Sequence, residues 1–195
     1  MIAVEGTSGS AVAAAARSLA RALHDATGHG GVSAWDASGI FTELAAAEAG
    51  IAGPSARTLT LLYAADLAFR VRWHIAPALD AGESVVVAPY IESAKALSIA
   101  AGLPRRWLDE VFGFAPKPHV CYRVKEPRRR ESSGRQNGYS ESFTSALVAN
   151  GDPTDPAELR ARSTEYLNSL EARRRCIRFT PGEVARLTRP QTRRR

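Results

Sequence analysis

The first 26 residues of the chain read MIAVEGTSGSAVAAAARSLARALHDA, and this stretch contains the pattern that decides the fold. The apolar run from Met1 to Val4 ends at Glu5 and Gly6, which is typical of a buried strand that leads into a glycine turn. The segment from Ala11 to Ala26 is rich in alanine and repeats apolar side chains along one helical face. A strand, a glycine-containing turn and a helix in this order begin an α/β unit.

The same alternation continues along the chain. Three consecutive valines between Ser84 and Ala88 indicate a central strand buried on both faces. Further strands are predicted over residues 32–35, 119–124 and, at an edge, 176–179. Helices are predicted over residues 41–49, 57–79 (with its last turn disturbed by Pro77), 91–102 and 155–172, with a helix or loop over 107–112 and a short helix after Pro181. Asp155 and Pro156 supply an N-cap and a proline in the first helical position. This order predicts a three-layer α/β/α domain with a mostly parallel sheet.

The composition is that of a globular protein, with 195 residues of which 45% are hydrophobic and 24% charged. It excludes collagen-like, disordered and membrane-spanning classes, so we expect a single domain over residues 1–195 and no membrane partner. Cys121 and Cys176 are too few for a disulfide framework. We therefore expect reduced thiols, with Cys121 buried and inert, and a cytoplasmic protein.

The charge is unevenly distributed along the chain. Residues 1–116 contain 8 Lys and Arg against 11 Asp and Glu, whereas residues 117–195 contain 18 against 9. The basic part includes a lid-like loop over residues 125–140 and a basic tail over residues 190–195. Such a segment fits a polyanionic partner, such as nucleotide phosphates or nucleic acid, or equally a solvated arginine-rich face.

Residues 6–13, GTSGSAVA, have the length and position of a phosphate-binding loop, whose pattern is G-x-x-x-x-G-K-[ST]. In such a loop the backbone N–H groups surround the phosphates, the lysine neutralises them and the hydroxyl binds Mg²⁺. Gly6 is in place, but Ala11, Val12 and Ala13 replace the second glycine, the lysine and the hydroxyl-bearing residue. The pattern fits either a remnant of a phosphate-binding loop or an ordinary turn between a strand and a helix.

Several segments together resemble the thymidylate kinase family of P-loop nucleoside monophosphate kinases. The resemblance runs from Met1 to about Val124, and more loosely to about Leu170. The segments that carry it are Ile2–Gly6, Leu61–Leu67, Ile75–Val86, Ala88–Tyr90 with Ser93, and Pro118–Val120. The resemblance implies a P-loop kinase fold. The activity of the family, which the resemblance therefore implies, is the transfer of a phosphoryl group from ATP to dTMP with Mg²⁺.

The departures from the family pattern are concentrated at its charged positions. Ser8 replaces the aspartate of the family's phosphate loop, Leu67 replaces an arginine, and Ala88-Pro89 replaces the Asp-Arg pair. Residues 35–39 stand where the family has Arg-Glu-Pro-Gly, without the arginine. Pro89 removes a backbone donor as well as a cation. Scaffold positions are thus retained while catalytic charges become apolar.

The resemblance also implies which residues form the site. The phosphate-loop remnant comprises Glu5, Gly6, Thr7, Ser8, Gly9, Ser10, Ala11, Val12 and Ala13. The acceptor pocket comprises Tyr63, Asp66, Leu67, Arg70, Tyr90 and Ser93, and the lid carries Arg128, Arg129, Arg130 and Arg135. Tyr63 stands where the family stacks the base, although an aromatic there also fits a helix core. Tyr90 fits the acceptor pocket or plain packing at a strand end, and the lid arginines fit a phosphate clamp or a solvated loop.

These observations favour a thymidylate kinase-like protein that has lost ordinary phosphoryl transfer and binds a nucleotide-like molecule or a protein. On this hypothesis no cofactor is expected, and the four histidines have no metal-ligand spacing. One alternative is an active dTMP kinase that uses ATP and Mg²⁺ with substitute cations, either Arg128–Arg130 or Arg70 and Arg72. Another is a nucleic-acid binder, although no recognition pattern accompanies the basic residues. The resemblance also implies a homodimer through the apolar helix over residues 57–79, because the corresponding helix forms the dimer interface in the family.

Overall fold

The computed structural model describes residues 1–35, 54–125, 143–144, 147 and 155–179, and these form a five-stranded, wholly parallel sheet in the order β2-β3-β1-β4-β5. The strands are β1 (Ile2–Glu5), β2 (Gly31–Ala34), β3 (Val85–Ala88), β4 (Val120–Arg123) and β5 (Ile177–Arg178). The predicted parallel sheet is confirmed. The predicted helices over 41–49 and after Pro181, the lid-like loop with its arginines and the tail over 190–195 lie outside the described residues.

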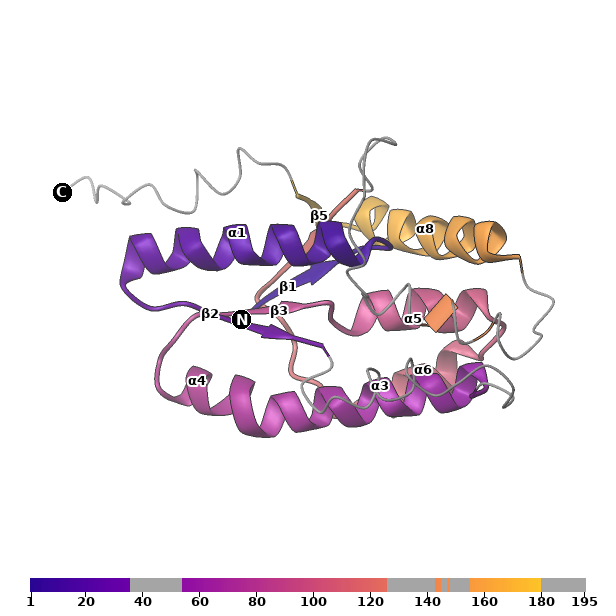
Figure 1. Cartoon of the computed structure of the whole chain (residues 1–195), viewed down its shortest axis with the longest axis horizontal. Helices are drawn as coiled ribbons and strands as arrows, with labels where there is room; N and C mark the ends of the chain where they lie inside the picture. Colours follow the sequence, from indigo (N-terminus) through magenta and orange to yellow (C-terminus); the bar gives the residue numbers. More distant parts are fainter. Residues whose placement is uncertain (36–53, 126–142, 145–146, 148–154, 180–195) are drawn as a thin grey trace.

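The side chains of β1, the middle strand of the sheet, alternate between two separate hydrophobic cores, because successive residues of a strand point to opposite faces. Val4 packs with Val86 and with helix α1 (Gly9–Thr27) on one face. Ala3 packs with Val87 on the other face, under helices α3 (Ala56–Arg70) and α5 (Ile91–Ala100). Helix α8 (Pro156–Ala172) packs against α5, and α6 (Arg105–Val111) also contacts α5. Figure 1 shows helices on both sides of the sheet, which confirms the three-layer prediction.

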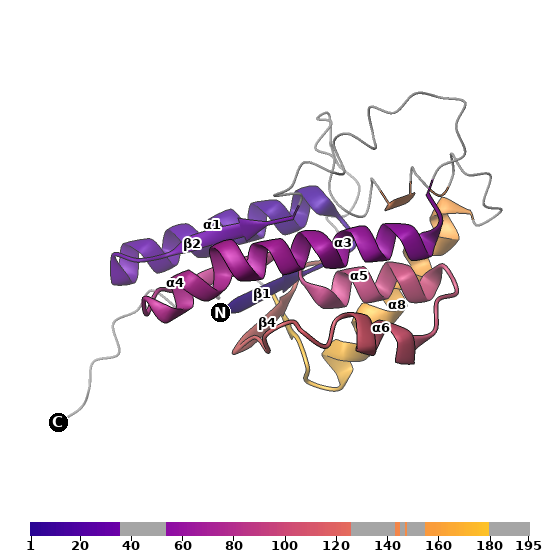
Figure 2. The same cartoon turned by 90° about the horizontal axis from the view of Figure 1, so that it is seen from below.

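The long helix predicted over residues 57–79 is divided in three. Helix α3 is followed by one π-helical turn, η1 (Val71–Ile75), and by the short α4 (Ala76–Asp80), which Figure 2 shows as one long helical path. In η1 the N–H of Ala76 donates to the carbonyl of Val71, five residues earlier. Pro77 has no N–H for the carbonyl of Trp73, so the α-helical ladder is interrupted where the sequence places the proline.

Two helix starts follow from capping side chains. Ser8 precedes α1, and its hydroxyl accepts a hydrogen bond from the N–H of Ala11. Asp155 precedes α8, and its carboxylate accepts from the N–H of Ala157, with Pro156 in the first helical position. Both arrangements satisfy N–H groups that a helix leaves without an internal partner. The predicted cap at Asp155 is confirmed.

The structure corrects the expectation of two free thiols. Cys121 in β4 and Cys176, immediately before β5, form a disulfide with their Cα atoms 4.6 Å apart. The ladder pairs Tyr122 with Ile177, so the residues that precede these two positions face each other across adjacent strands. The prediction that Cys121 is a reduced thiol is therefore wrong. The cytoplasmic location inferred from that state stays a prediction.

No helix within the described part of the chain is long and apolar enough to cross a membrane. In the same residues no group of three or more histidine, cysteine, aspartate or glutamate side chains is placed to hold a metal ion.

Removing the disulfide is predicted to destabilise the fold. The bond closes a loop of 55 positions, and restricting the unfolded chain over that length is worth about 4 kcal/mol in the chain-entropy model. The double variant Cys121→Ala/Cys176→Ala should therefore melt about 8–16 °C below the oxidised protein, measured by circular dichroism. Dithiothreitol should lower the melting temperature of the wild type and leave that of the variant unchanged. Equal melting temperatures for the oxidised wild type and the variant would contradict the assignment.

Candidate functional site

The candidate site lies at the carboxyl edge of the sheet, where β1, β2 and β3 end. Helices α1 and α5 follow the neighbouring strands β1 and β3 and pack on opposite faces of the sheet. In parallel α/β sheets, ligands bind outside the carboxyl ends of strands at the point where successive connections diverge in this way. The phosphate-loop remnant follows β1 and the Ala88-Pro89-Tyr90 segment follows β3, so both sequence-predicted motifs lie at that point.

Glu5 is the centre of this edge, and it joins β1 to the first turn of α5. The side chain is fully buried, and its Oε2 accepts hydrogen bonds from the N–H of Tyr90 (3.2 Å), the N–H of Ser93 (2.9 Å) and the Ser93 hydroxyl (2.5 Å). Its Oε1 accepts from the N–H of Glu92 at 3.0 Å. The side chain of Tyr90, which precedes α5, makes no capping hydrogen bond. The side chain of Glu5 in β1 therefore supplies the acceptor for N–H groups at the start of this helix.

Burial dominates the protonation of Glu5. Removal from water raises the pKa of its carboxyl group to about 7, and the nearby Glu92 carboxylate acts in the same direction. The hydrogen bonds from Ser93 and from the two backbone N–H groups act against this rise, because they stabilise the charged form. Glu5 is therefore committed to internal contacts and does not face a ligand.

The phosphate-loop remnant is a short, filled turn. Only residues 6–8 connect β1 to α1, so Gly9 and Ser10, which a phosphate-binding loop would use to surround its ligand, are helical. Val12 is only 2% exposed, and its Cγ2 atom lies 2.8 Å from the position that a Cβ on Gly6 would occupy. Hydrocarbon thus fills the turn at the position of the family's lysine. The residues present do not fit a magnesium-bound triphosphate.

Tyr63 is a core residue in this structure. Its side chain is completely buried, and its hydroxyl lies 2.9 Å from the carbonyl oxygen of Pro89 and 3.1 Å from that of Tyr90, to which it donates. Its ring meets Phe112 edge to face, with 6.1 Å between the ring centres. Burial raises the pKa of the Tyr63 hydroxyl, which keeps it protonated as a donor. No face of the ring is open for a flat ligand, and the core interpretation of Tyr63 agrees with this position.

Asp66 and Arg70 form a buried ion pair on α3. The Nε of Arg70 lies 2.8 Å from Oδ2 of Asp66, and both side chains are fully buried. The guanidinium also lies 5.7 Å from the centre of the Tyr63 ring and reaches the carbonyl of Ser33 in β2 at 3.5 Å. An internal partner therefore neutralises Arg70, one of the substitute cations proposed for an active kinase. Leu67, between the two charges, is part of the hydrophobic core.

Tyr90 and Ser93 complete the packed cluster. Tyr90 is buried, its hydroxyl donates to the carbonyl of Pro116, and burial raises the pKa of that hydroxyl. The Ser93 hydroxyl accepts from the N–H of Gly6 at 3.0 Å while donating to Glu5. The structure thus brings the phosphate-loop remnant and the acceptor-pocket residues together, as the family resemblance implies, but through contacts with one another. The peptide bond between Ala88 and Pro89, beside them, is cis.

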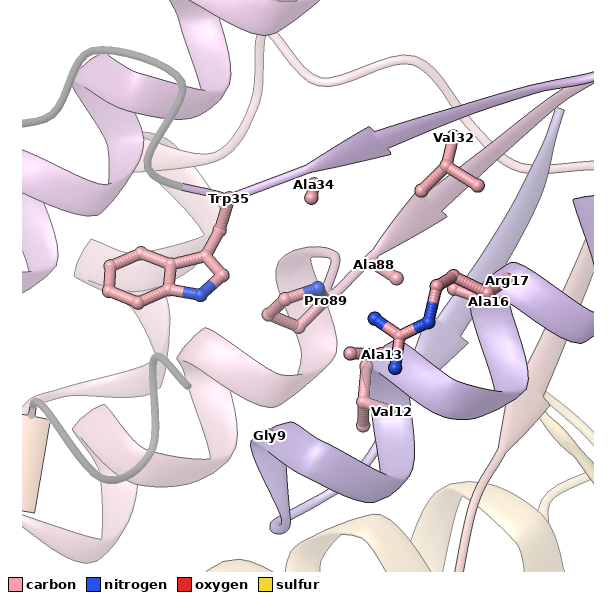
Figure 3. Close-up of a pocket in the computed structure, with 10 residues that line it drawn as sticks. All are labelled: Gly9, Val12, Ala13, Ala16, Arg17, Val32, Ala34, Trp35, Ala88 and Pro89. Atoms are coloured by element: carbon pink, nitrogen blue, oxygen red, sulfur yellow. The ribbon is translucent and has the colours of Figure 1, made fainter. Parts of the chain in front are cut away.

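A cavity of about 310 Å³ opens beside this cluster, between α1 and the ends of β2 and β3 (Figure 3). It is lined by Gly9, Val12, Ala13, Ala16, Arg17, Val32, Ala34, Trp35, Ala88 and Pro89. Sequence reasoning missed the contributions of Ala16, Arg17 and the β2 residues. The signal was present, because the five α1 residues follow the i, i+3, i+4, i+7, i+8 spacing of one helical face. The prediction for residues 11–26 is one apolar helical face and does not extend to a cavity beside it.

Comparison with known proteins supports the family resemblance. No protein-family model matches the chain. The probable thymidylate kinase of Pyrococcus abyssi is 34% identical over 86 residues, which are 42% of each chain. That of Pyrococcus horikoshii is 42% identical over 74 residues, 36% of each chain, and that of Thermococcus gammatolerans is 39% identical over 80 residues, 41% of this chain and 38% of the relative. The chain is thymidylate kinase-like.

The chain spans about two fifths of the length of the curated thymidylate kinases it matches. The five-stranded parallel sheet with helices is consistent with a P-loop kinase-like fold. In this thymidylate kinase-like chain the strand ends retain their place, while described positions that carry charge in the family pattern hold the uncharged Ser8, Val12, Leu67, Ala88 and Pro89 or the internally bonded Glu5 and Asp66.

The raised pKa of Glu5 predicts a pH dependence of stability with an unusual sign. The folded state binds a proton at Glu5 up to about pH 7, whereas the unfolded state releases it near pH 4.5. The proton on Glu5 therefore adds at most about 3 kcal/mol to the free energy of unfolding. This contribution is fully present below pH 4.5 and is lost as the pH rises through 7. Denaturant titrations of the wild type and Glu5→Gln between pH 5 and pH 8 should show this fall in the free energy of unfolding for the wild type only.

The exposed Glu110→Gln provides the control, because Glu110 pairs only with the exposed Arg106 in the described structure and should keep the wild-type slope. The Glu5 variant is expected to be less stable at every pH, since its amide N–H₂ faces the N–H of Glu92. If its stability fell with pH as steeply as that of the wild type, Glu5 would not be the titrating group.

Proposed function

We propose that this thymidylate kinase-like chain does not perform ordinary phosphoryl transfer from ATP with Mg²⁺, and acts as a binding module for a nucleotide-like small molecule or a protein. The observation that carries the proposal is the turn between β1 and α1. Val12 fills it, and Ala13 offers no hydroxyl for a metal ion. Phosphoryl transfer depends on positioning and charge stabilisation, and these positions supply neither.

The other described charges of the site support the same proposal. Arg70 is held by Asp66 and is not available to a phosphate without breaking a buried contact, and the carboxyl group of Glu5 is held by α5. Separating a buried ion pair by removing one partner costs about 3–5 kcal/mol, which disfavours recruitment of Arg70. Arg72 is exposed on η1, where its guanidinium lies 5.4 Å from the centre of the Trp73 ring.

An active kinase remains the alternative outcome of the test, with cations from Arg128–Arg130, which lie outside the described residues. Nothing in the described residues favours the nucleic-acid alternative. ATP and Mg²⁺ are implied only by the kinase alternative.

The loss of phosphoryl transfer can be tested by restoring the missing groups. A coupled assay of dTMP phosphorylation by the wild type should give no magnesium-dependent turnover. Isothermal titration with MgATP and with dTMP gives the affinity of the wild type for each nucleotide. The double variant Val12→Lys/Ala13→Thr should gain affinity for MgATP, because an opposite charge near a phosphate is worth several-fold or more in binding. Ala13→Thr alone serves as the matched control and should gain little. Turnover by the wild type that disappears with EDTA would reject the proposal.

We also propose that the protein partner is a second copy of the chain, bound through α3 and η1. Exposed apolar side chains recur every four positions on this segment: Leu61 (47%), the small Ala65, Phe69 (41%) and Trp73 (60%). Exposed apolar residues that gather on one element are typical of interfaces. The position agrees with the homodimer predicted from residues 57–79.

Light scattering should therefore report a dimer for the wild type and a monomer for Phe69→Lys/Trp73→Lys. Two lysines in an apolar contact would have to lose their hydration, which opposes association. The melting temperature of the isolated chain should change little, because both side chains are exposed. Phe114→Lys, at a similarly exposed phenylalanine outside the segment, is the control and should stay dimeric. A monomeric wild type at high concentration would contradict the interface.

A further inference from the structure

The cavity beside the phosphate-loop remnant has two walls of different character. The wall from the sheet carries the Trp35 indole and the Pro89 ring, and the wall from α1 carries the small side chains of Ala13 and Ala16 (Figure 3). Small residues on one side and the flat indole beside the proline ring on the other leave space for a flat apolar group. The volume of about 310 Å³ is at the lower end of the range for small-molecule sites.

Arg17 is the one charged side chain among the described residues that line this cavity. It is exposed, and within the described part of the chain it takes part in no hydrogen bond or ion pair. Figure 3 shows its guanidinium pointing back along α1 towards Ala13, the direction in which helical side chains project. A planar cation that has no side-chain partner among the described residues therefore borders an apolar space.

We propose that this cavity binds a small molecule with a flat apolar body and a single anionic group, the body lying between α1 and Trp35 and the anion pairing with Arg17. The inference deepens the proposed function and rests on it, since it names the ligand class of the binding module. A carboxylate and a sulfonate share the required chemistry, because each carries one negative charge and accepts the paired N–H donors of a guanidinium.

The same walls argue against a magnesium-bound triphosphate as the occupant. Such a ligand has several negative charges, and the described lining offers one cation to receive them. Each further charge would leave water for an alanine, valine or proline surface without a partner, which strongly opposes binding. The preference for a single charge therefore follows from the apolar residues that replace the family's charged positions.

A matched pair of fluorescent probes tests this inference. The first probe is 8-anilinonaphthalene-1-sulfonate, which has a flat aromatic body and one anionic group. The second is N-phenyl-1-naphthylamine, which has the same rings and no charge. We expect saturable 1:1 binding of the sulfonate probe to the folded wild-type protein. Arg17→Gln should weaken it on the order of tenfold while the affinity for the neutral probe stays unchanged.

Two further variants separate the cavity from the general surface. Arg21→Gln removes an exposed arginine one turn further along α1 that does not line the cavity, so it should leave both affinities unchanged. Ala13→Phe places a ring in the cavity and should weaken both probes. The melting temperature of each variant is recorded, because partly unfolded protein also binds such dyes.

The inference is overturned if Arg17→Gln and Arg21→Gln weaken the sulfonate probe equally, if Ala13→Phe leaves both affinities intact, or if the wild type binds neither probe. Failure of the proposed function is recognised separately, in the coupled kinase assay. Magnesium-dependent turnover would reject the proposed function whatever the probes do. Absence of turnover together with absent or non-specific probe binding would reject this inference alone.

Discussion

The hydrogen bonds that the buried Glu5 carboxylate accepts from the first turn of α5 are the constraint on which the site depends. No cation takes part in these bonds, and the N–H and O–H donors at the positive end of the helix dipole act against the rise in pKa that burial causes. The contact fixes the end of β1 against the start of α5. Tyr63 then fixes α3 to the same place, because its hydroxyl donates to carbonyls of the segment between β3 and α5. Three elements distant in the sequence are joined at one edge.

The polar groups near the carboxyl edge face inward. Besides Glu5, Asp66 and Arg70 neutralise each other under α3, and Arg123 at the end of β4 donates to Asn168 and Glu171 of α8. Each of these contacts holds an element in place. A catalytic site for phosphoryl transfer directs its charges towards the ligand and keeps them available there. In the described residues the charges of Glu5, Asp66, Arg70 and Arg123 instead hold the framework together, and Arg17 is the charged side chain that lines the cavity.

Sequence reasoning succeeded where the decisive interactions were local. Three consecutive valines identified β3, and Asp155-Pro156 identified the start of α8. It failed where the decisive contact joins distant segments. The disulfide links cysteines 55 positions apart, and only the order of the strands brings them together. The buried role of Glu5 was also invisible, because a glutamate at a strand end is ordinarily solvated and its partners lie more than 80 residues away.

The partial failure at α1 has a different physical reason. Ala13, Ala16 and Arg17 have the spacing of a packed face, and periodicity alone does not tell whether that face meets a neighbour or borders a space. Here the opposing surface is made of Ala88 and Pro89, which replace the aspartate and arginine of the family pattern. Short side chains on both sides leave a gap that longer charged ones would enter. The residues that depart from the family's charged positions are therefore also residues that line the cavity, so the proposed loss of one ligand and the proposed binding of another would have a common cause.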